Sequence, residues 1–127
     1  MTQPTIGKRR ERRFIAMTAD AAMRRDLAAH VPADWEMVVA TDLDQIGDWN
    51  DILLHRFMLL DLDETSAFDP QELVTTIRME YLLQIAIFCF GGDREMREAL
   101  RLARADRFFE RDELVRMLPG FLTQYGW

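Results

Sequence analysis

Residues 57–63 read Phe57-Met58-Leu59-Leu60-Asp61-Leu62-Asp63, four apolar residues followed by two carboxylates that one leucine separates. An unbroken apolar run is typical of a strand buried on both faces, since a strand with one wet face alternates apolar and polar residues. Such strands belong to parallel sheets that helices cover on both sides. Carboxylates at the end of such a strand lie at the edge where open α/β sheets build their sites.

Further apolar runs lie along the chain, and amphipathic stretches separate them. In order, the strand-like runs are Phe14–Met17, Trp35–Ala40, Arg56–Leu60, Gln84–Phe90 and Arg107–Phe109. Between runs the apolar residues recur with helical spacing, and Asp20 is placed to cap the first helix. Strict alternation with right-handed crossovers predicts an α/β, flavodoxin-like fold: a five-stranded parallel sheet in the order 2-1-3-4-5 with helices on both faces.

Three local features carry separate expectations. Leu43, Ile46, Trp49 and Leu53 fall on one face of a helix, which we expect to run through Gly47. His55, just before the third strand, is expected to face solvent. Pro119 is expected to kink or shorten the last helix, because proline has no N–H to donate.

The charge is unevenly distributed over the 127 residues, whose formal net charge is −6. Residues 8–13 hold five basic side chains and one acidic one, so the remainder has eleven basic and twenty-one acidic side chains, a net of −10. We expect a basic N-terminal tail over residues 1–12 and one domain over residues 13–127. An acidic body repels phosphates, so nucleic acid is not an expected partner.

The composition excludes several other classes. No apolar run approaches the roughly 18 residues of a membrane span, and the N-terminus lacks a signal-peptide pattern, so we expect a cytoplasmic protein with no membrane partner. Cys89 is the only cysteine, and His30 and His55 are 25 residues apart. Neither a disulfide framework nor a metal site of Cys and His is therefore expected.

Several stretches resemble the receiver domain of two-component response regulators, over nearly the whole chain. Ile15-Ala16-Met17-Thr18-Ala19-Asp20-Ala21-Ala22-Met23-Arg24-Arg25 is similar to its first strand and helix, and residues 57–63 are similar to its third strand. Phe68-Asp69-Pro70 resembles the start of its third helix, and Ala103–Phe109 resembles the approach to its fifth strand. The resemblance implies that Asp61 stands at the phosphoacceptor position.

The resemblance also implies an Mg²⁺ site that this sequence keeps only in part. A receiver has an acidic pair after its first strand, which holds Mg²⁺ together with the phosphoacceptor. The aligned residues here are Thr18 and Ala19, and Asp20 follows one position late. Asp20 is also the expected helix cap.

Two further positions depart from the receiver pattern. A receiver has Thr or Ser at the end of its fourth strand, where this chain has Cys89. It ends its fifth strand with Lys-Pro, where this chain has Phe109-Glu110-Arg111-Asp112. Arg111 offers a positive charge, but its planar fork is not interchangeable with lysine. Phe108 stands at the switch-aromatic position without a hydroxyl.

Phosphoryl transfer depends on positioning and charge neutralisation, so an aspartate without these partners is not expected to react. We therefore expect a stand-alone pseudo-receiver of two-component or phosphorelay type that acts by protein–protein interaction. We do not expect it to be an enzyme, and we expect no catalytic residue, cofactor or bound metal. A shallow pocket that exposes Asp61 is expected to be formed with Thr18, Ala19, Asp20, Asp63, Cys89 and Arg111.

Two alternatives remain open. In the first, Asp61 is phosphorylated and Mg²⁺ is the cofactor. In the second, Asp61-Leu62-Asp63-Glu64-Thr65 resembles the Asp-x-Asp-x-Thr motif of haloacid-dehalogenase-type phosphohydrolases, with Asp61 as nucleophile and Asp63 as general acid. The mid-chain position of this motif and the absence of lysine after Lys8 are unlike that family.

The stretch from the fourth predicted helix to the fifth is rich in arginine and in acidic residues. Receivers commonly pair through this face, so Arg97, Arg101 and Arg104 are candidate contacts of a homodimer. Otherwise the expected partner is another protein, such as a component of a histidine-kinase pathway.

Overall fold

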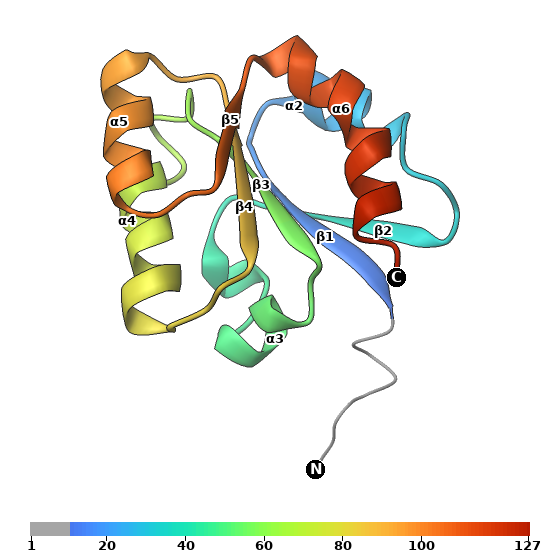
Figure 1. The fold of residues 1–127 in the computed structure, drawn as a ribbon, viewed down its shortest axis with the longest axis horizontal. Coiled ribbons are helices and arrows are strands. Elements are labelled where there is room, and N and C mark those ends of the chain that lie inside the picture. The colour runs from blue at the N-terminus through green and yellow to red at the C-terminus, as the bar shows by residue number, and fades with distance from the viewer. Residues whose placement is uncertain (1–10) are drawn as a thin grey trace.

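The computed structural model describes residues 11–127 and confirms one sheet of five parallel strands in the order β2-β1-β3-β4-β5 (Figure 1). The strands are β1 (Arg12–Met17), β2 (Trp35–Ala40), β3 (Phe57–Asp61), β4 (Ala86–Phe90) and β5 (Arg107–Phe109). The helical elements are α2 (Ala21–Ala28), η1 (Leu43–Gln45), α3 (Trp49–Leu53), α4 (Pro70–Thr75), η2 (Thr76–Glu80), α5 (Arg94–Leu102) and α6 (Arg111–Gln124). Because the strands all run the same way, their carboxyl ends meet at one edge of the sheet.

Each face of the sheet has its own core. Helices α2 and α6 cover one face, where Phe57 stacks on Phe14 with ring centroids 4.9 Å apart and Phe88 stacks on Phe121 at 4.5 Å. Helices α3, α4 and α5 cover the other face, where the core is mainly aliphatic (Figure 1). All of β3 is buried between the two cores, as its unbroken apolar sequence predicts.

The expectation of one continuous helix through Gly47 is wrong. Gly47 has a φ of 130°, which a helix cannot contain, and it divides the stretch into the 3-10 turn η1 and the short helix α3. Trp49 and Leu53 consequently remain exposed, and Ile52 is the residue of α3 that enters the core. Helix α6, by contrast, runs past Pro119 to Gln124, so the proline does not shorten it.

A buried arginine, which the sequence analysis did not single out, joins three segments on the aliphatic face. Arg78 lies in the π-helical turn η2, and its side chain donates to the carbonyls of Arg104 and Leu83 and to Asp106 at 3.0 Å. The same Asp106 oxygen accepts the Ile87 N–H at 2.7 Å. This cluster therefore ties η2 to the start of β4 and to the turn before β5.

Most of the expected tail, residues 1–12, lies outside the described residues. Arg12 is the first residue of β1, and its guanidinium donates to Asp34 at 2.6 Å and to the Gly126 carbonyl at 2.9 Å. Arg13 likewise belongs to β1 and pairs with Glu36 at 2.9 Å. No helix in residues 11–127 is long and apolar enough to cross a membrane.

Candidate functional site

The carboxyl ends of β1 and β3 and the start of α6 meet around Asp61, the last residue of β3. Only 3% of the Asp61 surface is exposed, so the expectation that it opens to solvent is wrong. Its carboxylate is enclosed by Thr18, which is fully buried, and by Arg111, and both side chains donate hydrogen bonds to it.

Arg111, the first residue of α6, binds three carboxylates at once. Its Nη1 donates to Asp61 at 2.8 Å and to Asp63 at 3.0 Å, and its Nη2 donates to Asp20 at 2.5 Å. The guanidinium also lies over the ring of Phe90, 5.0 Å from the centroid. A planar group with several fixed donors is suited to this bridging, which a single lysine ammonium would not reproduce in the same geometry.

The pKa values of Arg111 and Asp20 are both shifted towards their charged forms. Burial lowers the pKa of Arg111, but the hydrogen bond and charge of Asp61, with Asp63 and Asp20, raise it by more. The pKa of Asp20 lies below its usual value, first because the Met23 N–H donates to its carboxylate and then because of Arg111, while burial opposes the shift. Asp20 thus serves as the N-cap of α2 and as a partner of Arg111.

Both oxygens of Asp61 accept hydrogen bonds. Thr18 Oγ1 donates to Oδ2 at 2.7 Å, while the Asp63 N–H donates to Oδ1 at 2.9 Å beside Arg111. Thr18 is fully buried and its hydroxyl also accepts the Asp20 N–H at 3.1 Å. Ala19 lies exposed at the same edge and supplies no polar side chain.

The placement of Cys89 in this pocket is wrong by one residue. In the register of the sheet, Leu60 pairs with Cys89 and Asp61 pairs with Phe90. Cys89 is fully buried in the aliphatic core, and that burial raises the pKa of its thiol to about 12. The residue of β4 level with Asp61 is therefore an aromatic ring beneath Arg111, not a hydrogen-bond donor.

The turn after β4 holds Asp63 in place, and the sequence analysis missed this role. Asp63 Oδ1 accepts the Gly92 N–H at 2.8 Å, and Gly91 and Gly92 have φ values of 75° and 76°. A Cβ on Gly91 would lie 2.1 Å from Asp63 Oδ2. The sequence signal for this contact was the pair of adjacent glycines, because glycine adopts positive φ readily and lets another side chain lie close to the backbone.

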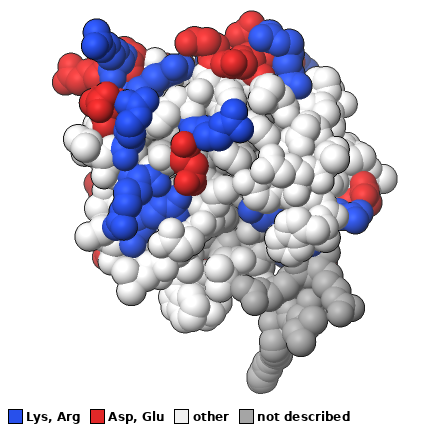
Figure 2. Space-filling model, in the orientation of Figure 1, with Lys and Arg blue, Asp and Glu red and all other residues white. Residues whose placement is uncertain are grey.

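The remaining predicted residues lie on the face formed by α5 and β5. Phe108 packs against the aliphatic core with Arg101 over its ring at 5.1 Å. The side chain of Arg97 is bound within the same molecule, since it donates hydrogen bonds to the carbonyls of Gly91 and Phe109 at 2.9 Å each. Figure 2 shows a band of basic side chains, broken by acidic ones, on the side of the molecule formed by α5. Arg104 is exposed and contacts Met79.

The structure resembles solved receiver structures along nearly its whole length. It superposes on the phosphorylated cyanobacterial phytochrome response regulator RcpA with a TM-score of 0.72 at 14% identity, covering 91% of this chain and 94% of that one. It superposes on the CheY-like protein tadZ from Pseudomonas aeruginosa PAO1 with a TM-score of 0.69 at 16% identity, covering 91% and 99%. The chain has the receiver fold.

A third similar structure is the signal receiver domain of a response regulator from Bermanella marisrubri, with a TM-score of 0.68 at 20% identity, covering 87% of this chain and 97% of that one. Comparisons with protein-family models and with curated protein sequences find no match. At these identities the receiver fold is what the comparisons establish.

Within this receiver fold, the residues around Asp61 do not fit a Mg²⁺ ion. Mg²⁺ requires near-octahedral oxygen coordination, and the end of β1 offers a threonine hydroxyl and an alanine where carboxylates would be needed. Both Asp61 oxygens already accept hydrogen bonds, and Arg111 lies among the three carboxylates. Across residues 11–127, no group of three or more His, Cys, Asp or Glu side chains is arranged to hold a metal ion.

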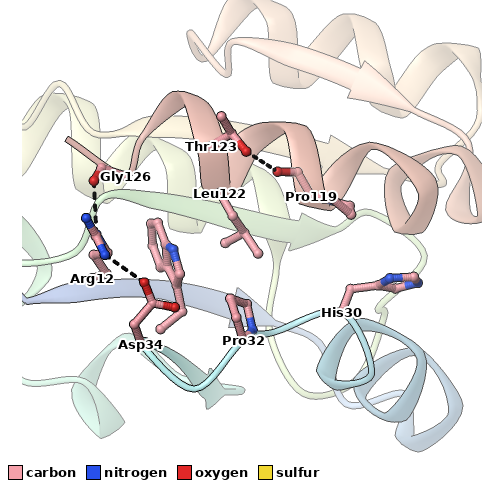
Figure 3. A pocket seen from close by; sticks show the side chains of 9 residues that line it. Arg12, His30, Pro32, Asp34, Pro119, Leu122, Thr123 and Gly126 are labelled. Carbon is pink, nitrogen blue, oxygen red and sulfur yellow. Dashed lines mark hydrogen bonds and ion pairs between the residues drawn. The ribbon is translucent and has the colours of Figure 1, made fainter.

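Two hollows of similar size differ in what they offer. An open hollow of about 420 Å³ lies at the site, lined by Ala19, Asp20, Asp61, Asp63, Glu64 and Arg111. Another of about 390 Å³ lies between the α2–β2 turn and α6 (Figure 3), where Arg12 is bonded to Asp34 and Gly126 and Thr123 is bonded to the Pro119 carbonyl. Arg12, Asp34 and Thr123 of that second hollow are thus engaged within the chain, and Asp61 does not line it.

Proposed function

We propose that this receiver-fold protein is a pseudo-receiver, a signalling domain that works through protein–protein contacts without phosphorylation of Asp61. The observation that carries the proposal is the Arg111 guanidinium, bonded at the same time to Asp20, Asp61 and Asp63. An internal cation there takes the place that a metal ion and a lysine would need.

Two physical arguments support the absence of phosphoryl transfer. The nucleophile of such a step is a carboxylate oxygen that must reach the phosphorus in line, and both oxygens of Asp61 are engaged by donors in a side chain that is 3% exposed. Three carboxylates and one guanidinium also leave the site with a net negative charge, which repels an anionic phosphoryl donor.

A domain of this kind acts by presenting a fixed surface to a partner. The face of α5 and β5, with its mixed arginine and acidic side chains, is the proposed contact, either with a second copy or with a protein of a histidine-kinase pathway. Arg101 and Arg104 are exposed there, whereas the internal bonds of Arg97 make it a supporting residue.

The test is incubation with acetyl phosphate and MgCl₂ followed by intact-mass spectrometry. We expect no phosphoryl adduct on the natural chain. A triple variant, Thr18→Asp with Ala19→Asp and Arg111→Lys, restores the acidic pair and the lysine type, and it serves as the matched comparison. An acid-sensitive adduct on the natural chain that disappears in Asp61→Asn would overturn the proposal in favour of a phosphorylatable regulator.

A further inference from the structure

A groove independent of Asp61 lies between the turn that follows β2 and the first turns of α4 (β2 and α4 in Figure 1). Its volume is about 310 Å³, and none of Asp20, Asp61 or Arg111 lines it. Its apolar floor is formed by Leu43, Phe68, Leu73 and Tyr81, all of which belong to the aliphatic core or pack on it. The groove therefore offers a fixed apolar floor.

The rim of this groove is acidic. It is formed by Asp42, Asp44, Asp69 and Glu72. Asp42 and Asp69 each use one oxygen to cap η1 and α4, and in the part of the chain that the structure describes none of the four carboxylates takes part in an ion pair. No basic residue lines the groove.

The sequence around the groove is depleted of positive charge. Residues 26–77 contain twelve acidic side chains and one basic side chain, Arg56, whereas the rest of the chain contains ten acidic and fifteen basic side chains. Arg56 cannot serve the rim, because it is buried at the other end of β3 and donates to the carbonyls of Tyr125 and Trp127. The negative potential of this region is therefore not neutralised by its own segment.

We infer that this groove docks a basic segment of a partner protein, a short stretch with arginine or lysine on both sides of an apolar anchor. The apolar floor would receive the anchor, while the carboxylates of the rim would pair with the cations on each side of it. Arginine in particular matches carboxylates with a planar pair of donors. A phosphate-bearing polymer is disfavoured here, because the rim would repel it.

Within residues 11–127 the chain offers no basic segment to this groove. No Lys or Arg lines it, and the first two arginines of β1 pair elsewhere, Arg12 with Asp34 and Arg13 with Glu36. The proposed occupant is therefore a segment of another molecule.

The test is fluorescence anisotropy with two labelled peptides of equal charge, Leu-Arg-Arg-Leu-Arg-Arg-Leu and Ser-Arg-Arg-Ser-Arg-Arg-Ser, at low ionic strength. We expect the leucine peptide to bind more tightly, because only it fills the apolar floor. Asp44→Asn with Glu72→Gln should weaken its binding about three- to tenfold, since each exposed ion pair contributes a few-fold. These two side chains make no hydrogen bond within residues 11–127, so the folded chain should persist, as circular dichroism can verify.

The control variant, Glu80→Gln with Glu95→Gln, removes the same charge from exposed positions outside the groove and should change the affinity less than twofold. Equal losses in both double variants, or equal binding of both peptides, would mean general attraction to an acidic body and would overturn the proposal. Self-association of the natural chain that only the Asp44/Glu72 variant loses would make the occupant a second copy and would also overturn it.

Discussion

The Nη1 atom of Arg111 lies 2.8 Å from Oδ1 of Asp61, although 50 residues separate them in the sequence. The bond joins the first residue of α6 to the last residue of β3, so a helix on the aromatic face is tied to the central strand at the sheet edge. Because Asp20 and Asp63 bond to the same guanidinium, the ends of β1, β3 and β5 converge on one cation. The stability of this edge therefore depends on Arg111.

Replacing Arg111 with alanine should leave three neighbouring carboxylates without their cation. We expect a loss of about 1–3 kcal/mol in the free energy of unfolding, less than for a fully buried pair because 31% of the Arg111 side chain is exposed. Millimolar MgCl₂ should raise the Tm of Arg111→Ala by more than that of the natural chain, because a divalent cation relieves the repulsion. Equal Tm shifts in the two proteins would contradict a charge-based role.

The buried cluster around Arg78 supplies a second stability prediction. Arg78→Met keeps most of the volume but leaves the carbonyls of Leu83 and Arg104 without their donor and Asp106 without its ion pair. We expect a loss of about 2–4 kcal/mol in urea unfolding. Arg116→Met is the control, since the exposed pair of Arg116 with Asp112 should be worth less than about 0.5 kcal/mol. Similar losses in the two variants would show that the Arg78 cluster adds no more than a surface pair.

The sheet could be predicted from the sequence because its signal is local and repeated. Each strand is an apolar run with a helical stretch after it, and Asp20 caps helix α2 as expected. The break at Gly47 was missed because apolar spacing continues across it, while the choice between helix and turn there depends on one backbone angle.

The site was less predictable, for two physical reasons. A strand buried on both faces has no polar alternation, so its sequence does not indicate which residue points to which face, and the pocket was assigned Cys89 where the register places Phe90. The bridging by Arg111 depends on how α6 is set against β3, a long-range relationship with no local signal. Arg78 and Asp106 illustrate the same limit, since their sequence neighbours look like those of surface charges.

His55 leads to a prediction about pH. It was expected at the surface, but it is 7% exposed, with Nδ1 2.9 Å from the Asp51 carbonyl and Nε2 without a partner within the described residues. Nδ1 therefore carries the proton, since a carbonyl can only accept. Burial lowers the pKa of His55, and the Asp51 carbonyl opposes that shift only in part.

Because the pKa of His55 is lower in the folded chain, the unfolded chain binds a proton at a higher pH than the folded chain does. The free energy of unfolding should therefore fall as the pH drops below about 6.5, by at most about 1.4 kcal/mol per pH unit. His55→Asn retains a donor near the Nδ1 position and cannot titrate, so its stability should be flatter between pH 7 and pH 5.5. The lowered pKa values of Asp20 and Glu64 act at more acidic pH. Parallel urea-unfolding profiles for the two proteins would refute the assignment.

The last prediction concerns self-association through the face of α5 and β5, where Arg101 and Arg104 are exposed beside Leu102, itself 80% exposed. We expect a weak dimer in sedimentation velocity that dissociates further as salt rises, because exposed ion pairs are screened. Arg101→Ala with Arg104→Ala should weaken it about tenfold, since a two-fold contact uses each arginine twice. Arg25→Glu on α2 changes the net charge by the same amount away from this face and should have little effect. A chain shortened to begin at Glu11 keeps the Arg12 and Arg13 contacts of β1 and should dimerise unchanged. Loss of the dimer on this shortening would move the interface to the N-terminus, and a monomer at every salt and protein concentration would leave only a different protein as the partner.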